Sequence, residues 1–312
     1  MFSRSSLAAV AAVGATALLL SACGSSAQSA PTSSAKDTIV FAAVPSEQSS
    51  SLRSQYENVI KVLEKDTGKK VEFQDATNYA AVIEGQRAGK IDIAGYGPFS
   101  YKIAKDGGVP IEPVSSAVKN PGDTPGYHST AWVPADSTIT DLSGFRGKKV
   151  CFVDAASTSG FLFPSAGLLE VGIDPNKDVT QVLAGKHDAS MLSTASGQCD
   201  AGFAQDSMVP DLIKKGQLKE GQLKQVWESP LIPGSPIAMN TTTLDADTQA
   251  KVRTALQEHA NVKWMVSNGI CTDEASCKMP EDKPYSVKVD DKFYDPIRQV
   301  CDATHAKACN AA

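Results

Sequence analysis

Residues 150–164 (VCFVDAASTSGFLFP) constrain the fold of this chain more than any other stretch. Residues 150–153 are an apolar run that predicts a strand, Asp154 breaks the run, and residues 157–160 (STSG) lead into an apolar segment compatible with a helix. The first N–H groups of a helix lack partners and the helix dipole favours negative charge there, so such a loop can hold an anion. A serine here could instead only cap the helix, and this stretch alone leaves both interpretations open.

Predicted strands alternate with predicted helices along most of the chain. Residues 37–44 (DTIVFAAV) and 70–73 (KVEF) are predicted strands, and residues 51–66 between them place apolar side chains at helical spacing. The alternation continues with a predicted helix at residues 80–88 and a predicted strand at residues 90–94. Because a strand, a helix and a strand in succession favour a parallel sheet, the sequence predicts an α/β fold.

The composition suits a globular protein without a strong overall electrostatic field. The chain has 312 residues, of which 42% are hydrophobic and 21% charged, which is enough for one large unit or two lobes. The formal net charge of -5 gives no reason to expect nucleic acid or an anionic membrane surface as a partner. An anionic ligand would therefore be held by local dipoles and hydrogen bonds.

The N-terminus predicts export. Arg4 precedes an apolar run at residues 7–20 that is too short to be a permanent membrane anchor, so residues 1–22 are interpreted as a signal peptide. The LSAC sequence that ends at Cys23 is similar to a bacterial lipobox, which implies lipid attachment to this cysteine. An ordinary signal with a chance cysteine is the alternative. Residues 23–37, rich in Ser, Ala and Gly, are predicted to be a flexible lipoprotein tether.

The remaining cysteines predict disulfides, because an even number of them occurs in an exported chain. Short loops favour the pairs Cys271–Cys277 and Cys301–Cys309, which leaves Cys151–Cys199, although sequence alone does not fix the pairing. A metal site is the competing interpretation. The chain has no CxxC pair and no His at ligand spacing, so we expect no bound metal.

Tyrosines occur in loops next to the predicted strands and helices. Tyr79 lies just before a predicted helix, and Tyr96 follows the predicted strand at residues 90–94. Ligands of open α/β sheets bind at the carboxyl ends of strands, where a tyrosine could present its O–H to an anion. Half-buried tyrosines without such a role are the alternative.

The C-terminal quarter is less informative. Residues 248–266 have apolar side chains at helical spacing and predict a long helix, for which Asp247 is a plausible N-cap. Residues 272–312 are rich in predicted loops, and apart from the cysteines they do not indicate a fold.

Together these segments resemble the substrate-binding proteins of ABC importers for phosphate, phosphite and phosphonates. The resemblance covers residues 39–237, and the STSG run combined with residues 229–234 (SPLIPG) is its most specific part. Further matching segments are residues 78–84 (NYAAVIE), 89–97 (GKIDIAGYG), 126–127 (GY) and 184–187 (AGKH). The resemblance implies a two-lobed type II periplasmic-binding-protein fold with a ligand cleft between the lobes, and closure of the lobes on binding.

The resemblance also implies which residues bind the ligand. The expected set is Tyr79, Tyr96, Tyr127, Ser157, Thr158, Ser159, His187 and Asp206. The three consecutive hydroxyl residues match the turn that holds the oxyanion, and His187 can donate from a ring nitrogen and add charge if protonated. Asp206 could accept a hydrogen bond from a P–OH group, or it could instead cap a following helix. Asp154 is expected to order the loop.

Two positions depart from family members that bind aminoalkylphosphonates. Ser207 and Ser235 stand where those proteins look to have carboxylates, which would hold the ammonium group of the ligand. The loss of both argues against an amine-bearing ligand. The resemblance then implies a small phosphorus oxyanion such as phosphate, phosphite or a small phosphonate.

The implied function is that of a lipid-anchored protein on the outer face of the cytoplasmic membrane, which delivers its ligand to an ABC permease. We expect a monomer with a discontinuous lobe 1 (residues 38–132 and 238–312) and a lobe 2 (residues 133–237). Another organic anion, such as a sulfonate, is the alternative ligand for the same fold.

An enzyme is the alternative from a different class. Ser157 or Ser159 with His187 and Asp206 would supply a hydrolase triad, but no Gly-x-Ser-x-Gly sequence surrounds these serines. The chain also has no Walker-type loop and no dinucleotide fingerprint. We therefore expect neither catalysis nor a cofactor.

Overall fold

A computed structural model describes residues 36–47 and 49–310 of the chain. The predicted signal peptide, Cys23 and nearly all of the predicted tether lie outside these residues. Within the described ranges, none of the helices combines the length and the apolar character that a membrane span requires.

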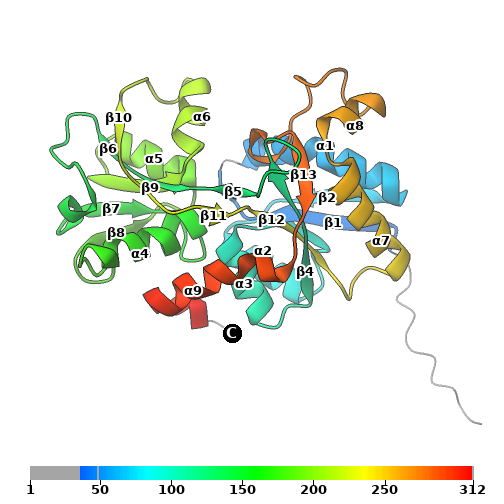
Figure 1. Cartoon of the computed structure of the whole chain (residues 1–312), viewed down its shortest axis with the longest axis horizontal. Helices are drawn as coiled ribbons and strands as arrows, with labels where there is room; N and C mark the ends of the chain where they lie inside the picture. Colours follow the sequence, from blue (N-terminus) through cyan, green and yellow to red (C-terminus); the bar gives the residue numbers. More distant parts are fainter. Residues whose placement is uncertain (1–35, 48, 311–312) are drawn as a thin grey trace, which may run out of the picture. The chain divides into compact units, whose positions relative to one another are not determined.

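The first sheet has six strands in the order β13-β4-β12-β3-β1-β2 (Figure 1). β1 pairs in parallel with β2 and β3, because α1 and α2 provide the crossovers, whereas β12 and β13 join antiparallel. The strands are β1 (Thr38–Ala43), β2 (Lys70–Gln74), β3 (Ile93–Gly95), β4 (Ile111–Val118), β12 (Pro236–Asn240) and β13 (Tyr285–Lys288).

The second sheet has five strands in the order β10-β6-β9-β7-β8. β7 pairs in parallel with β8 and β9, and β6 pairs antiparallel with β9 and β10. The strands are β6 (Ser129–Pro134), β7 (Lys149–Phe152), β8 (Thr180–Leu183), β9 (Ala201–Gln205) and β10 (Leu223–Glu228).

Two short antiparallel strands carry the chain between the sheets. β5 (Gly126–Tyr127) pairs with β11 (Ile232–Pro233), and Figure 1 shows both between the two sheets. The chain thus leaves the first sheet after β4 and returns to it at β12. The α/β class is confirmed, and β6 in the second sheet already begins at Ser129, ahead of the boundary predicted at residue 132.

Nine α-helices pack on these sheets within the described residues. They are α1 (Ser49–Thr67), α2 (Tyr79–Arg87), α3 (Pro98–Asp106), α4 (Phe163–Glu170), α5 (His187–Ala195), α6 (Met208–Lys214), α7 (Ala246–Thr254), α8 (Val262–Ser267) and α9 (Asp295–Thr304). Short 3₁₀ segments are η1 (Leu142–Phe145), η4 (Pro280–Asp282), η5 (Asp291–Tyr294) and η6 (Lys307–Asn310), and π-helical segments are η2 (Thr158–Leu162) and η3 (Ala255–His259).

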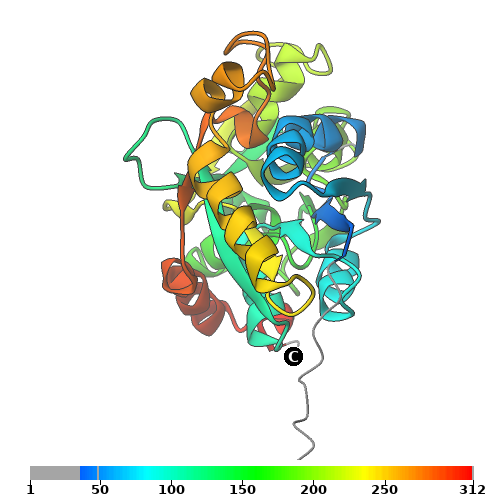
Figure 2. The same cartoon turned by 90° about the vertical axis from the view of Figure 1, so that its right-hand side faces the viewer.

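The first sheet is covered on both faces, because side chains of a strand alternate between them. Ile39 and Phe41 of β1 pack in one apolar cluster with α1, α7 and η3, whereas Ala42 belongs to a cluster with α2, α3 and α9. In Figure 2, α7 lies in front of this sheet with α1 beside it, and the two helices are in contact.

The predicted long helix at residues 248–266 is wrong in two respects. The N-cap is Asp245 instead of Asp247, since the Asp245 carboxylate accepts from the Thr248 N–H at 2.8 Å. The helix also ends before Asn261, whose side chain caps the separate helix α8. A capping residue two positions earlier and a second cap inside the apolar pattern were both missed, because spacing alone does not show where a helix breaks.

Three disulfides are present among the described residues: the two pairs that short loops favour and the pair that they leave over. Cys151–Cys199 joins β7 to the segment that precedes β9, Cys271–Cys277 closes a loop after α8, and Cys301–Cys309 links α9 to η6. The C-terminal segment, for which the sequence predicted no fold, adds β13 to the edge of the first sheet and packs α9 against α3 and α4.

Aromatic side chains form the centre of the second sheet's core, which allows a test of the fold. Phe203 of β9 is fully buried, and its ring lies 5.3 Å from that of Phe152 and 5.5 Å from that of Phe145. We expect Phe203→Ala to lower the free energy of unfolding by about 3–5 kcal/mol, measured by urea denaturation, because the cavity it leaves cannot be refilled. Leu183→Ala, at a position 54% exposed, should cost less than about 0.5 kcal/mol. Equal losses would contradict this packing.

Candidate ligand-binding site

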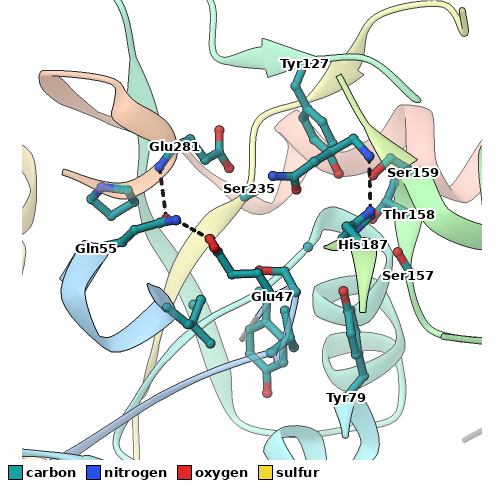
Figure 3. Close-up of a pocket in the computed structure, with 18 of the residues that line it drawn as sticks. Glu47, Gln55, Tyr79, Tyr127, Ser157, Thr158, Ser159, His187, Ser235 and Glu281 are labelled. Carbon is teal, nitrogen blue, oxygen red and sulfur yellow. Dashed lines mark hydrogen bonds between the residues drawn. The ribbon is translucent and has the colours of Figure 1, made fainter. Parts of the chain in front are cut away.

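A cavity of about 50 Å³ lies where loops from the two sheets meet (Figure 3). Of the predicted ligand-binding residues, those that line it are Tyr79, Tyr96, Tyr127, Ser157, Thr158, Ser159 and His187. The structure therefore brings together residues that are more than 100 positions apart in sequence, between Tyr79 and His187.

The hydroxyl run is both a helix cap and a cavity wall, so the two interpretations of this stretch are compatible. The Ser157 hydroxyl accepts from the Gly160 N–H at 3.1 Å and caps the π-helical turn η2, which continues into α4. Gly160 is required here, since a β-carbon would collide with the Val153 side chain. Asp154 accepts from the Ala156 N–H at 2.8 Å and orders the loop as expected.

Two tyrosine hydroxyls join this turn. Burial raises the pKa of Tyr79, whose hydroxyl also bonds with Ser157. Burial likewise raises the pKa of Tyr127, whose hydroxyl bonds with Thr158 and Ser159. Both phenols therefore keep their protons at physiological pH and remain hydrogen-bond donors.

Helix N-termini converge on the cavity. Tyr79 begins α2, Gly97 is the N-cap of α3, Ser157 is the N-cap of η2, and His187 begins α5, and all four residues line the cavity. Each terminus presents the positive end of a helix dipole and N–H groups without a partner inside the helix. The four together favour an anion at one place without a lysine or arginine.

Elements of the two sheets are in direct contact around the cavity. The Thr158 hydroxyl, which follows β7, accepts from the N–H of Phe99 in α3 at 2.8 Å. The His187 N–H donates to the Ser46 carbonyl, just after β1, at 2.8 Å. These bonds hold the loops of one sheet against those of the other.

His187 is buried and neutral. Only 3% of the residue is exposed, and burial lowers its pKa from 6.5 to about 3. Its Nδ1 accepts from the Gln205 N–H at 3.1 Å, so the ring proton is on Nε2, which is free to act as a donor. The predicted donor role remains possible, whereas added positive charge near neutral pH is not.

One predicted ligand residue lies outside the cavity. Asp206 does not line it, because its carboxylate accepts from the His128 N–H at 3.0 Å and so fixes the ends of β6 and β9. Asp206 also does not cap α6, since that helix begins at Met208 with Ser207 as its N-cap and no side-chain cap bond is formed. Tyr96 lines the cavity, and its buried hydroxyl has no hydrogen-bond partner among the described residues.

Sequence reasoning missed two carboxylates in the cavity wall. Glu47 lies in the loop after β1 and is 5% exposed, and Glu281 lies in η4 near the C-terminus. Glu47 could have been found by the same rule that selected the tyrosines, since it directly follows a predicted strand. No sequence signal indicated Glu281, because it reaches the cavity only through the tertiary placement of the C-terminal segment.

The buried His187 gives a pH dependence with a definite sign. A neutral His with a lowered folded-state pKa stabilises the protein fully above pH 6.5, and this stabilisation is lost as the pH falls towards about 3. We expect His187→Gln, which keeps an acceptor for the Gln205 N–H but cannot be protonated, to make the pH dependence of the unfolding free energy less steep in this window, by up to about 1.4 kcal/mol per pH unit. Denaturant titrations between pH 3 and pH 7 measure the slope.

The matched control for this experiment is His305→Asn, at an exposed position after α9. Its slope should equal that of the unmodified protein. A His187→Gln slope that is also unchanged would show that the ring is not buried in its neutral form.

Comparisons with known proteins agree with this architecture. The family model described as ABC transporter, phosphonate, periplasmic substrate-binding protein matches residues 41–269. The phosphate-import protein PhnD of Mycolicibacterium smegmatis is 44% identical over 305 residues, which cover 94% of each chain. The phosphonates-binding periplasmic protein of Escherichia coli is 31% identical over 216 residues, 66% of this chain and 62% of that protein.

A solved structure of a related protein has a similar fold. The binding protein component of an ABC phosphonate transporter from Pseudomonas aeruginosa matches with a TM-score of 0.74 and 27% identity, over 86% of each chain. The periplasmic-binding-protein fold expected from the sequence is thereby confirmed.

Proposed function

The chain belongs to the family of periplasmic substrate-binding proteins of phosphonate ABC transporters, and we propose that its cavity captures a small phosphorus oxyanion for delivery to the permease. The family members that it matches are transport proteins rather than enzymes. The relative from M. smegmatis is named for phosphate and that from E. coli for phosphonates, so both ligand classes are candidates.

The convergence of helix N-termini is the observation that carries this proposal. Within the described part of the chain, no lysine or arginine lines the cavity, yet four helix starts and the hydroxyls of Ser157, Thr158, Ser159, Tyr79 and Tyr127 are directed to it. A tetrahedral oxyanion has several oxygens that accept from N–H and O–H donors, and such donors can replace its water shell.

The size of the cavity favours a small ligand. Its volume of about 50 Å³ exceeds what one water molecule needs, roughly 10–15 Å³ on the same scale, by only a few-fold. That space suits an inorganic oxyanion or a one-carbon phosphonate better than a ligand with a long organic tail. Ser235 lines the cavity, whereas Ser207 lines the adjoining surface clefts.

We also propose that the two sheets are the centres of two lobes that close on the ligand. The first sheet, with strands from residues 38–118 and 236–288, is the centre of one lobe, and the second sheet, with strands from residues 129–228, is the centre of the other, with the crossings at β5 and β11. Support comes from the first sheet, which draws strands from both ends of the chain. A ligand that bridges Tyr79 and His187 makes differential contacts in the closed state and so shifts the population towards it.

The oxyanion turn gives a direct test. In the mature protein, the double substitution Ser157→Ala, Thr158→Ala should weaken phosphate or phosphonate binding by at least about tenfold in isothermal titration, because hydrogen bonds to charged groups contribute about 1.5–3 kcal/mol each. Ser165→Ala is the control, since this α4 hydroxyl bonds the Phe161 carbonyl and does not line the cavity. Unchanged affinity in the double variant would refute the assignment of the turn.

We further propose that the protein is a monomer held on the outer face of the cytoplasmic membrane by a lipid on Cys23. Cys23→Ala should release the protein from the membrane fraction of expressing cells and abolish labelling by a radioactive fatty acid. Cys151→Ala together with Cys199→Ala serves as the control, because these cysteines form an internal disulfide and should leave the anchor intact. Retention of Cys23→Ala in the membrane fraction would disprove lipidation.

A further inference from the structure

We propose that Glu47 and Glu281 form an acceptor wall, named here for these two residues, which makes the site select a ligand with a protonated oxygen. The preferred ligand is then a phosphorus oxyanion that carries a P–OH group, and sulfate is rejected. This inference rests on the proposed function and specifies the ligand within it.

The acceptor wall lies across the cavity from the oxyanion donors. Figure 3 shows the Glu47 and Glu281 side chains on the opposite side from Ser157, Thr158 and His187. Gln55 connects the two glutamates, because its amide donates to the Glu47 carboxylate and its carbonyl accepts from the Glu281 N–H at 3.3 Å. Gln55 therefore bonds the Glu47 carboxylate and the Glu281 backbone, and so holds the two residues in the same wall of the cavity.

The charges of both glutamates act on hydroxyls of the cavity. The pKa of Tyr56 is raised by burial and then by the charges of Glu281 and Glu47, and the Glu281 charge also acts on Tyr127. Tyr127 belongs to the donor cluster, so the carboxylate field extends across the space that a ligand would fill.

Both carboxylates are held in place from outside the cavity. Lys215, which follows α6, lies 2.9 Å from Glu47, and Lys283 lies 2.6 Å from Glu281. Neither lysine lines the cavity. Glu281 and Asp282 also have positive φ angles of 59° and 51°, which non-glycine residues seldom adopt, so the turn that presents Glu281 is a specified conformation.

Hydrogen-bond chemistry makes this arrangement selective for a ligand with a protonated oxygen. A carboxylate can only accept, and an oxyanion oxygen without a proton can also only accept, so the two repel each other in a desolvated cavity. A P–OH oxygen can donate to the acceptor wall while the other oxygens accept from the hydroxyls and helix N–H groups. Phosphate keeps at least one proton near neutral pH, whereas sulfate has none, although both are tetrahedral and of similar size.

An ammonium group on the ligand is the competing occupant of the acceptor wall. The cavity volume of about 50 Å³ argues against it, because an aminoalkyl tail needs additional space next to the oxyanion. A purely structural role is the second competitor, since Lys215 also bonds Ser51 at 2.9 Å and could simply hold α6 against α1. The experiment must separate these possibilities.

The test is the ratio of sulfate to phosphate dissociation constants, measured by isothermal titration on the mature protein and its variants. Glu47→Gln and Glu281→Gln each place an N–H donor in the wall, so at least one of them should lower the ratio by at least about tenfold. Both ligands are titrated into the same preparation of each variant. Partial unfolding would lower the number of sites for both ligands equally, so the ratio of the two dissociation constants would remain valid.

Two control variants isolate the wall. Ser51→Ala removes the hydroxyl through which Lys215 contacts α1 but keeps the Glu47–Lys215 ion pair, so the ratio should be unchanged. Glu84→Gln alters an exposed carboxylate of α2 that pairs with Arg87 outside the cavity, and it should change neither constant.

The outcomes separate this inference from the proposed function. An unchanged ratio in both glutamate variants, with phosphate still bound, would overturn the acceptor wall and leave the function in place. Tighter binding of aminoethylphosphonate than of phosphate, lost in the glutamate variants, would assign the wall to an ammonium group and also overturn the inference. Failure of the unmodified protein to bind phosphate, phosphite or methylphosphonate would reject both.

Discussion

The convergence of helix N-termini, with their dipoles and N–H groups, is the interaction on which the rest of this structure depends. A protein with a net charge of -5 has no long-range attraction for an anion, so the attraction must be generated locally. This local attraction is generated by helices that begin at one cavity. α2 and α3 follow strands of the first sheet, and η2 and α5 follow strands of the second. Only when the loops of these sheets meet do the dipoles add at one point.

The hydroxyl groups have a second function besides donating to a ligand. Thr158 bonds the N-terminus of α3, and Tyr79 and Tyr127 bond the turn that contains Ser157 and Ser159. Neutral donors can exchange these mutual bonds for bonds to an oxyanion without leaving a buried charge behind. The same set of groups can therefore hold the protein together around an empty cavity and around a filled one.

The two glutamates in the cavity wall each have a lysine partner. Glu47 pairs with Lys215, Glu281 pairs with Lys283, and His187 is neutral because it is buried. An uncompensated charge at this depth would cost more than it could gain. The distribution leaves neutral donors on one side of the cavity and fixed acceptors on the other, a pattern that can discriminate between anions by their protons.

Local patterns predicted much of this protein. The alternation of strands and helices, the hydroxyl run at a helix start and the disulfides across short loops all depend on residues close in sequence. The resemblance of successive segments to a known family predicted the fold, and all but one of the ligand residues that it implied line the cavity. These predictions succeed because capping, periodicity and loop closure act over a few residues.

The tertiary structure alone decided which side chains face the cavity. Asp206 satisfied the sequence rules, but its bond to the His128 N–H holds it outside the cavity. Glu281 faces the cavity because β13 extends the first sheet and brings the C-terminal segment back. Burial determines the protonation state of a side chain, and the meeting of distant segments determines which side chains line the cavity. Neither is encoded in the spacing of neighbouring residues.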